Sequence, residues 1–391
     1  MRFNGYSNPW TTQKLGDLGT FIKGAPLSKA DISNEGNPFI LYGELYTTYS
    51  EVTHSVKRKT DKTVEQQFYS KIGDVIMPTS GETPEDIATA SCIMLPDVIL
   101  AGDLLIYRTE QIDGRFVSYA IKNKVNKQIS SVAQGKSVVH VRADELAKIC
   151  ITFPALDEQK KILNLLELLD TRIATQQSLI ETLKKYKRGL LDKLLEDNST
   201  DANWHIVRLQ DVANGFDYGM NSAATTFDGV HKYIRITDID DDSRQYLSDD
   251  IVSPSDTPEE KYRVSDNDIL FARTGASVGK SYLYTPDDGA LYFAGFLIRI
   301  SVKKEYDSYF VYLNTLTSKY EKWLRLESMR SGQPGVNAEQ YRNYAFRCPN
   351  YQTQVKIANI IKGIDSKILK ERMSLSKLNS LKNGLLQQLF I

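Results

Sequence analysis

Apolar residues recur at alternating steps of four and three along two long stretches of the chain, residues 154–196 and 349–391. In the first stretch the series runs through Ile162, Leu166, Leu169, Ile173, Gln176, Ile180, Leu183 and Lys187. In the second it runs through Ile357, Ile361, Ile364, Ile368, Glu371, Leu375, Leu378 and Lys382. A repeat of 3.5 residues is typical of a helix that packs along its length against another helix. At 1.5 Å per residue, each predicted helix is about 60 Å long.

The second stretch is a copy of the first, shifted by 195 residues without a gap. Thirteen of the 43 paired positions are identical, and the apolar series is interrupted at the same two places, by Gln176 and Lys187 and by Glu371 and Lys382. A core helix within one domain is the commoner source of such a stripe, but the length and the matched interruptions favour two long helices packed on each other. The polar residues either fix the register of this pair or face partner proteins, and we favour the second interpretation.

The region before each helix follows the same plan. The shared positions are Trp10, Leu15 and Asp17 with Trp204, Leu209 and Asp211, and residues 74–77 with residues 268–271. Between these positions the two regions differ almost completely, which suggests one scaffold that reads two different things. The predicted boundaries are a globular part at 1–153, a helix at 154–196, a linker at 197–203, a second globular part at 204–348 and a second helix at 349–391.

Short strands and helices alternate within the globular parts. Strands are predicted around residues 15–23, 39–42, 74–78, 91–95 and 103–108, and around 233–238, 268–273, 281–285 and 294–300. Helices are predicted near residues 114–122, 142–148 and 308–324. This mixture predicts the α+β class rather than a doubly wound parallel sheet.

Composition narrows the function classes. The 391 residues include 49 basic and 49 acidic side chains, so a surface for nucleic acid must come from local arrangement rather than from net charge. Three cysteines and four histidines are too few and too scattered for a disulfide framework or a metal cluster. The chain shows neither a signal peptide nor an apolar run of 18 residues, and we therefore expect a cytoplasmic protein without a membrane span.

No catalytic motif withstands inspection. Residues 275–281 resemble a phosphate-binding P-loop, but three residues instead of four separate the first glycine from Gly279-Lys280. The acidic run at 238–242 is explained by a solvated loop. Neither a methyltransferase signature nor a Ser-His-Asp order is visible, so we expect no catalytic residue, no metal and no directly bound cofactor.

Side chains suited to nucleic acid are present in both globular parts. Arginine, lysine and amide side chains read base edges, whereas hydroxyl groups and backbone N–H groups hold phosphates. The candidates are Tyr42, Tyr46, Lys57, Arg58, Lys59, Thr79, Ser80, Gln134 and Lys136 in the first part, and Tyr218, Asn221, Tyr233, Arg235, Arg273, Thr274, Lys280, Arg330, Ser331 and Gln333 in the second. Each basic residue alone is more often a solvated surface charge. The loops around residues 134–137 and 331–337 serve equally well as plain connections.

The chain resembles the specificity subunits of Type I restriction–modification systems over essentially its whole length. The resemblance rests on the Trp-to-Asp openings at 10–17 and 204–211, on residues 73–76 and 268–275, and above all on the helix entries at 153–162 and 348–357. At the start of the second helix, Thr353 stands where the family usually has an acidic residue before glutamine. This difference weakens the resemblance at that one position only.

The resemblance implies a non-catalytic subunit with two target recognition domains and two helical regions. Each domain would read one half of a split, asymmetric site in double-stranded DNA. The helices would pack antiparallel as a pseudo-twofold coiled-coil spacer and set the gap between the halves. They would also dock two modification (methyltransferase) subunits that carry S-adenosylmethionine, and ATP- and Mg-dependent restriction subunits would join that core.

A rival interpretation from another class is a coiled-coil adaptor whose globular parts bind proteins. An adaptor would not bind DNA in a salt-dependent way with its partners present. A third interpretation is an enzyme, a P-loop NTPase, and it would require that the isolated chain bind a nucleotide. The sequence does not reveal the target bases, because base readout depends on loop geometry.

Overall fold

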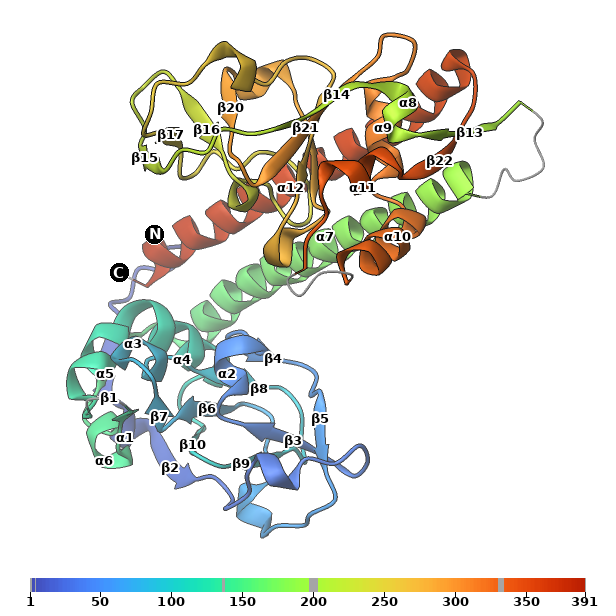
Figure 1. Cartoon of the computed structure of the whole chain (residues 1–391). Coiled ribbons are helices and arrows are strands. Elements are labelled where there is room, and N and C mark those ends of the chain that lie inside the picture. Colours follow the sequence, from blue (N-terminus) through green and yellow to red (C-terminus); the bar gives the residue numbers. More distant parts are fainter. Residues whose placement is uncertain (1, 4, 136–137, 197–202, 330–333, 391) are drawn as a thin grey trace. The chain divides into compact units, whose positions relative to one another are not determined.

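The computed structural model describes residues 2–3, 5–135, 138–196, 203–329 and 334–390. The chain divides into two compact units (Figure 1). The first comprises residues 1–176 and 374–391, and the second comprises residues 177–373. Each unit therefore contains one globular part and portions of both long helices. In the described part of the chain, no helix is long and apolar enough to span a membrane.

The globular part of the first unit is built on two sheets. The five-stranded sheet has the order β2-β10-β6-β8-β4 and comprises β2 (Gly19–Lys23), β4 (Val52–Thr53), β6 (Asp74–Pro78), β8 (Ser91–Ile93) and β10 (Leu104–Thr109). The three-stranded sheet has the order β5-β3-β9 and comprises β3 (Asn37–Leu41), β5 (Arg58–Thr60) and β9 (Ile99–Ala101). Strand β6 is buried along its whole length, because both of its faces meet apolar side chains. Most neighbouring strands are antiparallel, and β4–β8 and β3–β9 are parallel.

Short helices surround these sheets. They are α1 (Leu15–Leu18), α2 (Glu44–Thr47), α3 (Pro84–Ile87), α4 (Gly114–Ala120), α5 (Asn126–Val132) and α6 (Ala143–Leu146). The strand predicted at 15–23 is wrong in its first half, where the chain forms α1. The helix predicted at 114–122 is α4, which continues through a π-helical turn (Ile121–Val125) into α5.

The second unit has a four-stranded sheet of order β14-β21-β18-β19. Its strands are β14 (Ala213–Tyr218), β18 (Asp268–Ala272), β19 (Ser281–Leu283) and β21 (Leu297–Val302). Two smaller pairs join β15 (Ala224–Thr226) to β17 (Val252–Pro254) and β16 (Lys232–Ile234) to β20 (Leu291–Phe293). The helices are α8 (Leu209–Val212), α9 (Ser308–Asn314), α10 (Ser318–Ser328) and α11 (Ala338–Arg342). The single helix predicted at 308–324 is thus two helices, because Thr317 caps α10 by accepting the N–H of Tyr320.

In both units a strand pair carries the chain into the long helix. β1 (Thr11–Lys14) pairs with β12 (Cys150–Phe153), and β13 (His205–Arg208) pairs with β22 (Ala345–Cys348). Both pairs are antiparallel. The start of each globular part is therefore tied to its end, which explains the matched landmarks at the two openings.

The long helices are α7 (Leu156–Glu196) and α12 (Tyr351–Leu389) (Figure 1). In the first unit the beginning of α7 packs antiparallel to the end of α12, where Ile162, Leu163 and Leu166 share a core with Leu386 and Leu389. In the second unit the same arrangement joins the end of α7 to the beginning of α12. The predicted packing of two long antiparallel helices is confirmed.

The end of each helix lies in the core of the other repeat's globular part. Leu386, Leu389 and Phe390 belong to the core of the first unit, and Leu191 and Leu195 belong to that of the second. The apolar series did not predict this arrangement, because it treats each helix as an element that packs only on the other helix.

A partly buried ion pair joins the two helices in each unit. In the first unit, Lys382 Nζ lies 2.6 Å from Asp170 Oδ1, and the hydroxyl of Tyr119 donates to the same carboxylate at 2.5 Å. Lys382 also approaches Glu51 at 3.4 Å. Burial alone would lower the pKa of Lys382, but Glu51 and Asp170 raise it above its ordinary value.

The second unit repeats this pair at the equivalent positions. Lys187 Nζ lies 2.6 Å from Asp365 Oδ1, and Tyr309 donates to Asp365 at 2.5 Å. Lys187 and Lys382 thus contact the opposite helix. These ion pairs favour the register interpretation for the two lysines, and the partner-facing interpretation stays a prediction.

Candidate nucleic-acid interface

The first unit brings several predicted residues together where strand β6 ends. Thr79 follows β6, and β7 (Ser80–Gly81) pairs with β11 (Val139–His140). Gln134 forms an isolated bridge to His140. The backbone is held on both sides, because Thr79 donates its N–H to Asp103 O at 2.8 Å and its carbonyl accepts the N–H of Val141 at 3.1 Å. We call residues 79–81, Gln134 and residues 139–140 the first rim.

The second unit has the corresponding arrangement where strand β18 ends. Arg273 donates its N–H to Phe296 O at 3.0 Å, and its carbonyl accepts the N–H of Val336 at 2.9 Å. Thr274 bridges to Gly335 in the same segment. We call residues 273–275, residues 334–336 and Tyr218 the second rim.

The two rims share their backbone hydrogen bonds and differ in their side chains. Thr79 in the first unit has the bonding pattern of Arg273 in the second, and the carbonyl that holds it belongs to Asp103 in one case and Phe296 in the other. The same frame therefore carries a threonine bonded to an aspartate backbone in one unit and an arginine bonded to a phenylalanine backbone in the other. Such variation suits a surface that recognises two different targets.

A polar network holds the side chains of the first rim. The Ser80 hydroxyl lies 3.3 Å from Asp103 Oδ2 and 3.0 Å from His140 Nδ1, and Tyr46 donates to Ser80 O at 2.6 Å. Burial raises the pKa of Tyr46 above its ordinary value, so that its hydroxyl stays protonated. These residues do not form a hydrolase triad, because the serine rather than the histidine lies in the middle and is buried. The network instead orients the exposed ring of His140, which was not among the sequence candidates.

Three candidates of the second unit are corrected by their surroundings. Tyr233 is 1% exposed and donates its hydroxyl to Met220 O at 2.7 Å, so it is a core residue. Lys280 is 6% exposed and is bound to Ile239 O at 2.9 Å and to Asp241 at 2.5 Å. Arg235 pairs with Asp238 at 2.8 Å. These three side chains stabilise the fold. The sequence did not predict these contacts, because the partner residues lie in loops whose conformation cannot be predicted from local pattern.

The basic cluster of the first unit lies at the start of β5, an edge strand of the three-stranded sheet, with Lys57 just before the strand. Lys57 and Lys59 are exposed, whereas Arg58 pairs with Glu44 of α2 at 3.1 Å. Two other candidates, Tyr42 and Tyr46, meet edge to face with ring centroids 6.3 Å apart.

Of the remaining candidates, Asn221 is exposed. Lys136, Arg330, Ser331 and Gln333 lie outside the described residues, as does most of the predicted linker.

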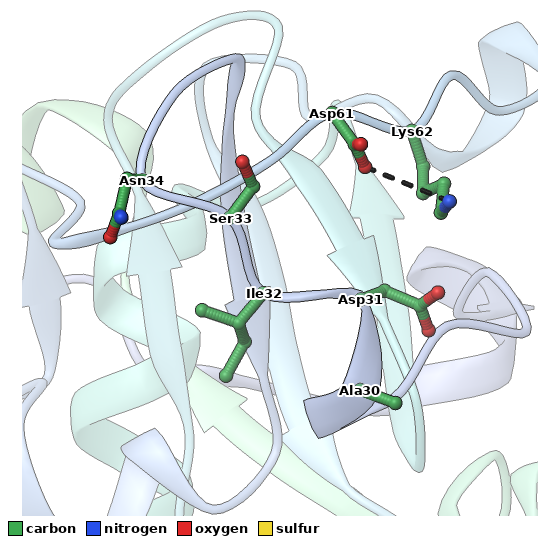
Figure 2. Close-up of a pocket in the computed structure, with 7 residues that line it drawn as sticks. All are labelled: Ala30, Asp31, Ile32, Ser33, Asn34, Asp61 and Lys62. Carbon is green, nitrogen blue, oxygen red and sulfur yellow. Dashed lines mark ion pairs between the residues drawn. The ribbon is translucent and has the colours of Figure 1, made fainter.

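A shallow hollow of about 380 Å³ lies elsewhere in the first unit (Figure 2). It is lined by residues 30–34 with Asp61 and Lys62. Asp61 and Lys62 pair with each other at 3.7 Å, and Figure 2 shows no convergence of the labelled side chains on a common centre. Within the described ranges, no cluster of histidine, cysteine and acidic residues could hold a metal ion. The hollow therefore provides no evident chemistry.

Comparison with known proteins gives one consistent family. A model of the Type I restriction modification DNA specificity domain matches residues 7–185 and again residues 201–379. The Type I restriction enzyme MjaVIII specificity subunit of Methanocaldococcus jannaschii is 22% identical over 412 residues, covering 97% of this chain and 92% of that protein. The Type I restriction enzyme StySPI specificity subunit of Salmonella potsdam is 22% identical over 424 residues, covering 97% of this chain and 88% of that protein.

A solved structure has the same fold. The Type I restriction–modification S subunit from M. genitalium superposes with a TM-score of 0.63 at 18% identity, covering 100% of this chain and 98% of that one. The double match of the family model reproduces the repeat seen in the sequence, because each match takes in one globular part and most of the long helix that follows it.

Proposed function

The chain belongs to the Type I restriction modification DNA specificity family, and on this premise we propose that it reads a DNA site in two separate halves, one with each globular part. It is a DNA sequence-recognition subunit and not itself an enzyme, because the matched family supplies specificity and not chemistry. The adaptor alternative has no support from the family or from the two curated relatives named above.

The observation that carries the two-half proposal is the equivalence of the two rims. Thr79 and Arg273 occupy the same place in the backbone bonding pattern, yet they offer different groups to a ligand. Direct readout in the major groove requires such differences, because each base pair presents its own pattern of donors and acceptors there. Two unlike rims on one repeated scaffold suit an asymmetric, bipartite site.

As a specificity subunit the chain works with DNA and with methyltransferase and restriction subunits. We propose that it recruits two modification subunits, which bind S-adenosylmethionine and methylate adenine, and that ATP- and Mg-dependent restriction subunits join them. Exposed apolar side chains on the long helices support docking there, because burial of such side chains against a partner protein is favourable. They are Leu156, Leu168, Leu179 and Tyr186 on α7, and Tyr351, Ile360, Leu369, Met373 and Leu381 on α12.

The decisive experiment is co-expression with the modification subunit, followed by mapping of methylated bases in the host DNA. We expect a bipartite asymmetric motif. Exchange of residues 1–150 for the same part of another family member should then change one half of the motif and leave the other intact. A change in both halves, or methylation without a sequence preference, would contradict the proposal.

A further inference from the structure

Arg273 of the second rim is held rigidly at its backbone and at its side chain. Its N–H and carbonyl are bonded to Phe296 and Val336, at 3.0 Å and 2.9 Å. Its guanidinium carbon lies 5.0 Å from the ring centroid of Tyr218, which is a cation–π contact. Tyr218 is fixed in turn, because its hydroxyl accepts the N–H of Ala338 at 3.2 Å. The position of the guanidinium is thus set before any ligand arrives.

No acceptor within the described residues satisfies this guanidinium. Nε of Arg273 is buried without a hydrogen-bond partner, and no carboxylate of the described chain forms an ion pair with it. Nε of Arg299 is likewise without a partner in the described chain, but the guanidinium of Arg299 pairs with Asp217 at 2.9 Å through another nitrogen, and that of Arg235 pairs with Asp238 at 2.8 Å. An unsatisfied buried donor in a folded protein requires an explanation. A ligand that supplies acceptors to this group would provide one.

The surroundings of Arg273 suit a base rather than a bare anion. Tyr218, whose ring lies against the guanidinium, is 43% exposed, and Phe296, whose carbonyl accepts the N–H of Arg273, is 57% exposed, so both aromatic residues are accessible to a ligand. An arginine fork matches the O6 and N7 acceptors of guanine, and aromatic rings contact neighbouring bases and thymine methyl groups.

The first unit has no equivalent group. At the positions of Arg273 and Tyr218, defined by the strand pairings of the two sheets, it carries Thr79 and Lys23. The pair formed by an arginine stacked on a tyrosine is therefore found at these positions in the second unit and not in the first.

We propose that Arg273, oriented by the ring of Tyr218, reads a guanine in the half-site bound by the second unit. This inference rests on the proposed function and names a specificity-determining contact within it. The other possible source of acceptors is a DNA phosphate, which would give affinity without base preference.

The test uses the complex with the modification subunit and compares wild type with Arg273→Ala and Arg273→Lys. Methylation is measured at every single-base variant of the second half-site. We expect both variants to lose the guanine preference at one position, by about tenfold to hundredfold, and to leave the first half-site unchanged. Lysine should fail despite its charge, because it lacks the planar two-pronged donor.

Arg263→Ala is the matched control, because Arg263 is an exposed arginine of the same unit that pairs with Glu260 at 3.6 Å. This variant should retain the wild-type motif. Unfolding temperatures check that all variants are folded, and Arg273→Lys, which keeps the stem and the charge, carries the test if Arg273→Ala is unstable.

Two outcomes would overturn the inference. An unchanged motif in both variants would show that Arg273 reads no base. Equal weakening at all sequences in Arg273→Ala, with a wild-type motif in Arg273→Lys, would assign it to a phosphate. In both cases the wild-type complex still methylates a bipartite site, so the proposed function would stand. Absence of a bipartite motif in the wild type would instead refute that function, and the inference with it.

Discussion

Single charged residues at equivalent sites connect the two long helices in each unit. The Lys382 side chain is 15% exposed, and its positive charge neutralises the carboxylates of Asp170 and Glu51, which are 32% and 9% exposed. Burial alone would raise the pKa of Glu51, but Lys122 and Lys382 lower it below its ordinary value. The cluster is therefore stable only while all of its charges are present, since an isolated buried charge is costly.

Replacement of Lys382 by Met should destabilise the first unit by about 2–4 kcal/mol, less than for a fully buried pair because Asp170 is partly exposed. The double variant Lys382→Met/Asp170→Leu should cost less than the sum of its single changes. Chemical denaturation of the four proteins in this cycle measures the coupling. Lys377→Met, at an exposed position of the same helix, is the control, and an equal loss in that variant would contradict a specific role for the pair.

At the scale of elements, one glutamine anchors the beginning of each long helix. Gln354 is 2% exposed, accepts the N–H of Asp307 at 3.0 Å and donates to Pro349 O at 2.9 Å. Gln159 does the same with Asp113 and Pro154, at 2.9 Å and 2.8 Å. Asp113 and Asp307 are the N-caps of α4 and α9. The repeated glutamine thus joins two helix starts in each unit, which gives the family's helix-entry motif a structural reason.

Gln354→Ala should lower the stability of the second unit by about 1–3 kcal/mol, because two buried polar groups lose their partners. Its neighbour Gln352 is exposed in the same helical turn, and Gln352→Ala should change stability by less than about 0.5 kcal/mol. Thermal unfolding followed by circular dichroism distinguishes the two. Similar unfolding temperatures for both variants would exclude the anchoring role.

At the scale of the whole molecule, each globular core is completed by the helix of the other repeat. Phe390 lies with its ring centroid 5.1 Å from that of Phe116 and is 3% exposed in the first core. Leu195, at the equivalent position of α7, is 3% exposed in the second core. Neither half of the chain therefore contains all the apolar residues of its own core.

Phe390→Ala should destabilise the first unit by about 3–5 kcal/mol and Leu195→Ala the second by about 2–5 kcal/mol, as expected for cavities in a packed core. Hydrogen exchange read separately over residues 1–176 and 177–373 shows which unit opens. Each substitution is the control for the other. Loss of protection in the unit that does not contain the substituted residue would contradict the crossed cores.

Much of this organisation follows from the sequence by itself. Local sequence patterns predicted the 195-residue repeat, the two long helices, their packing against each other and the α+β class. Periodicity and repeated motifs can be recognised in the sequence without information on contacts between distant residues. Strand β6 was predicted with its observed bounds for the same reason, since five consecutive buried residues leave a clear signature.

Only the tertiary structure decided which of the polar side chains are available to a ligand. Lys280 and Arg273 are both single basic residues in the sequence, yet Lys280 is buried against Asp241, while Arg273 stacks on Tyr218 and has no side-chain acceptor among the residues that the structure describes. Likewise, Lys187 and Lys382 find their carboxylates on the opposite helix. The availability of a charge depends on partners far away in the chain, and these partners are brought together only by folding.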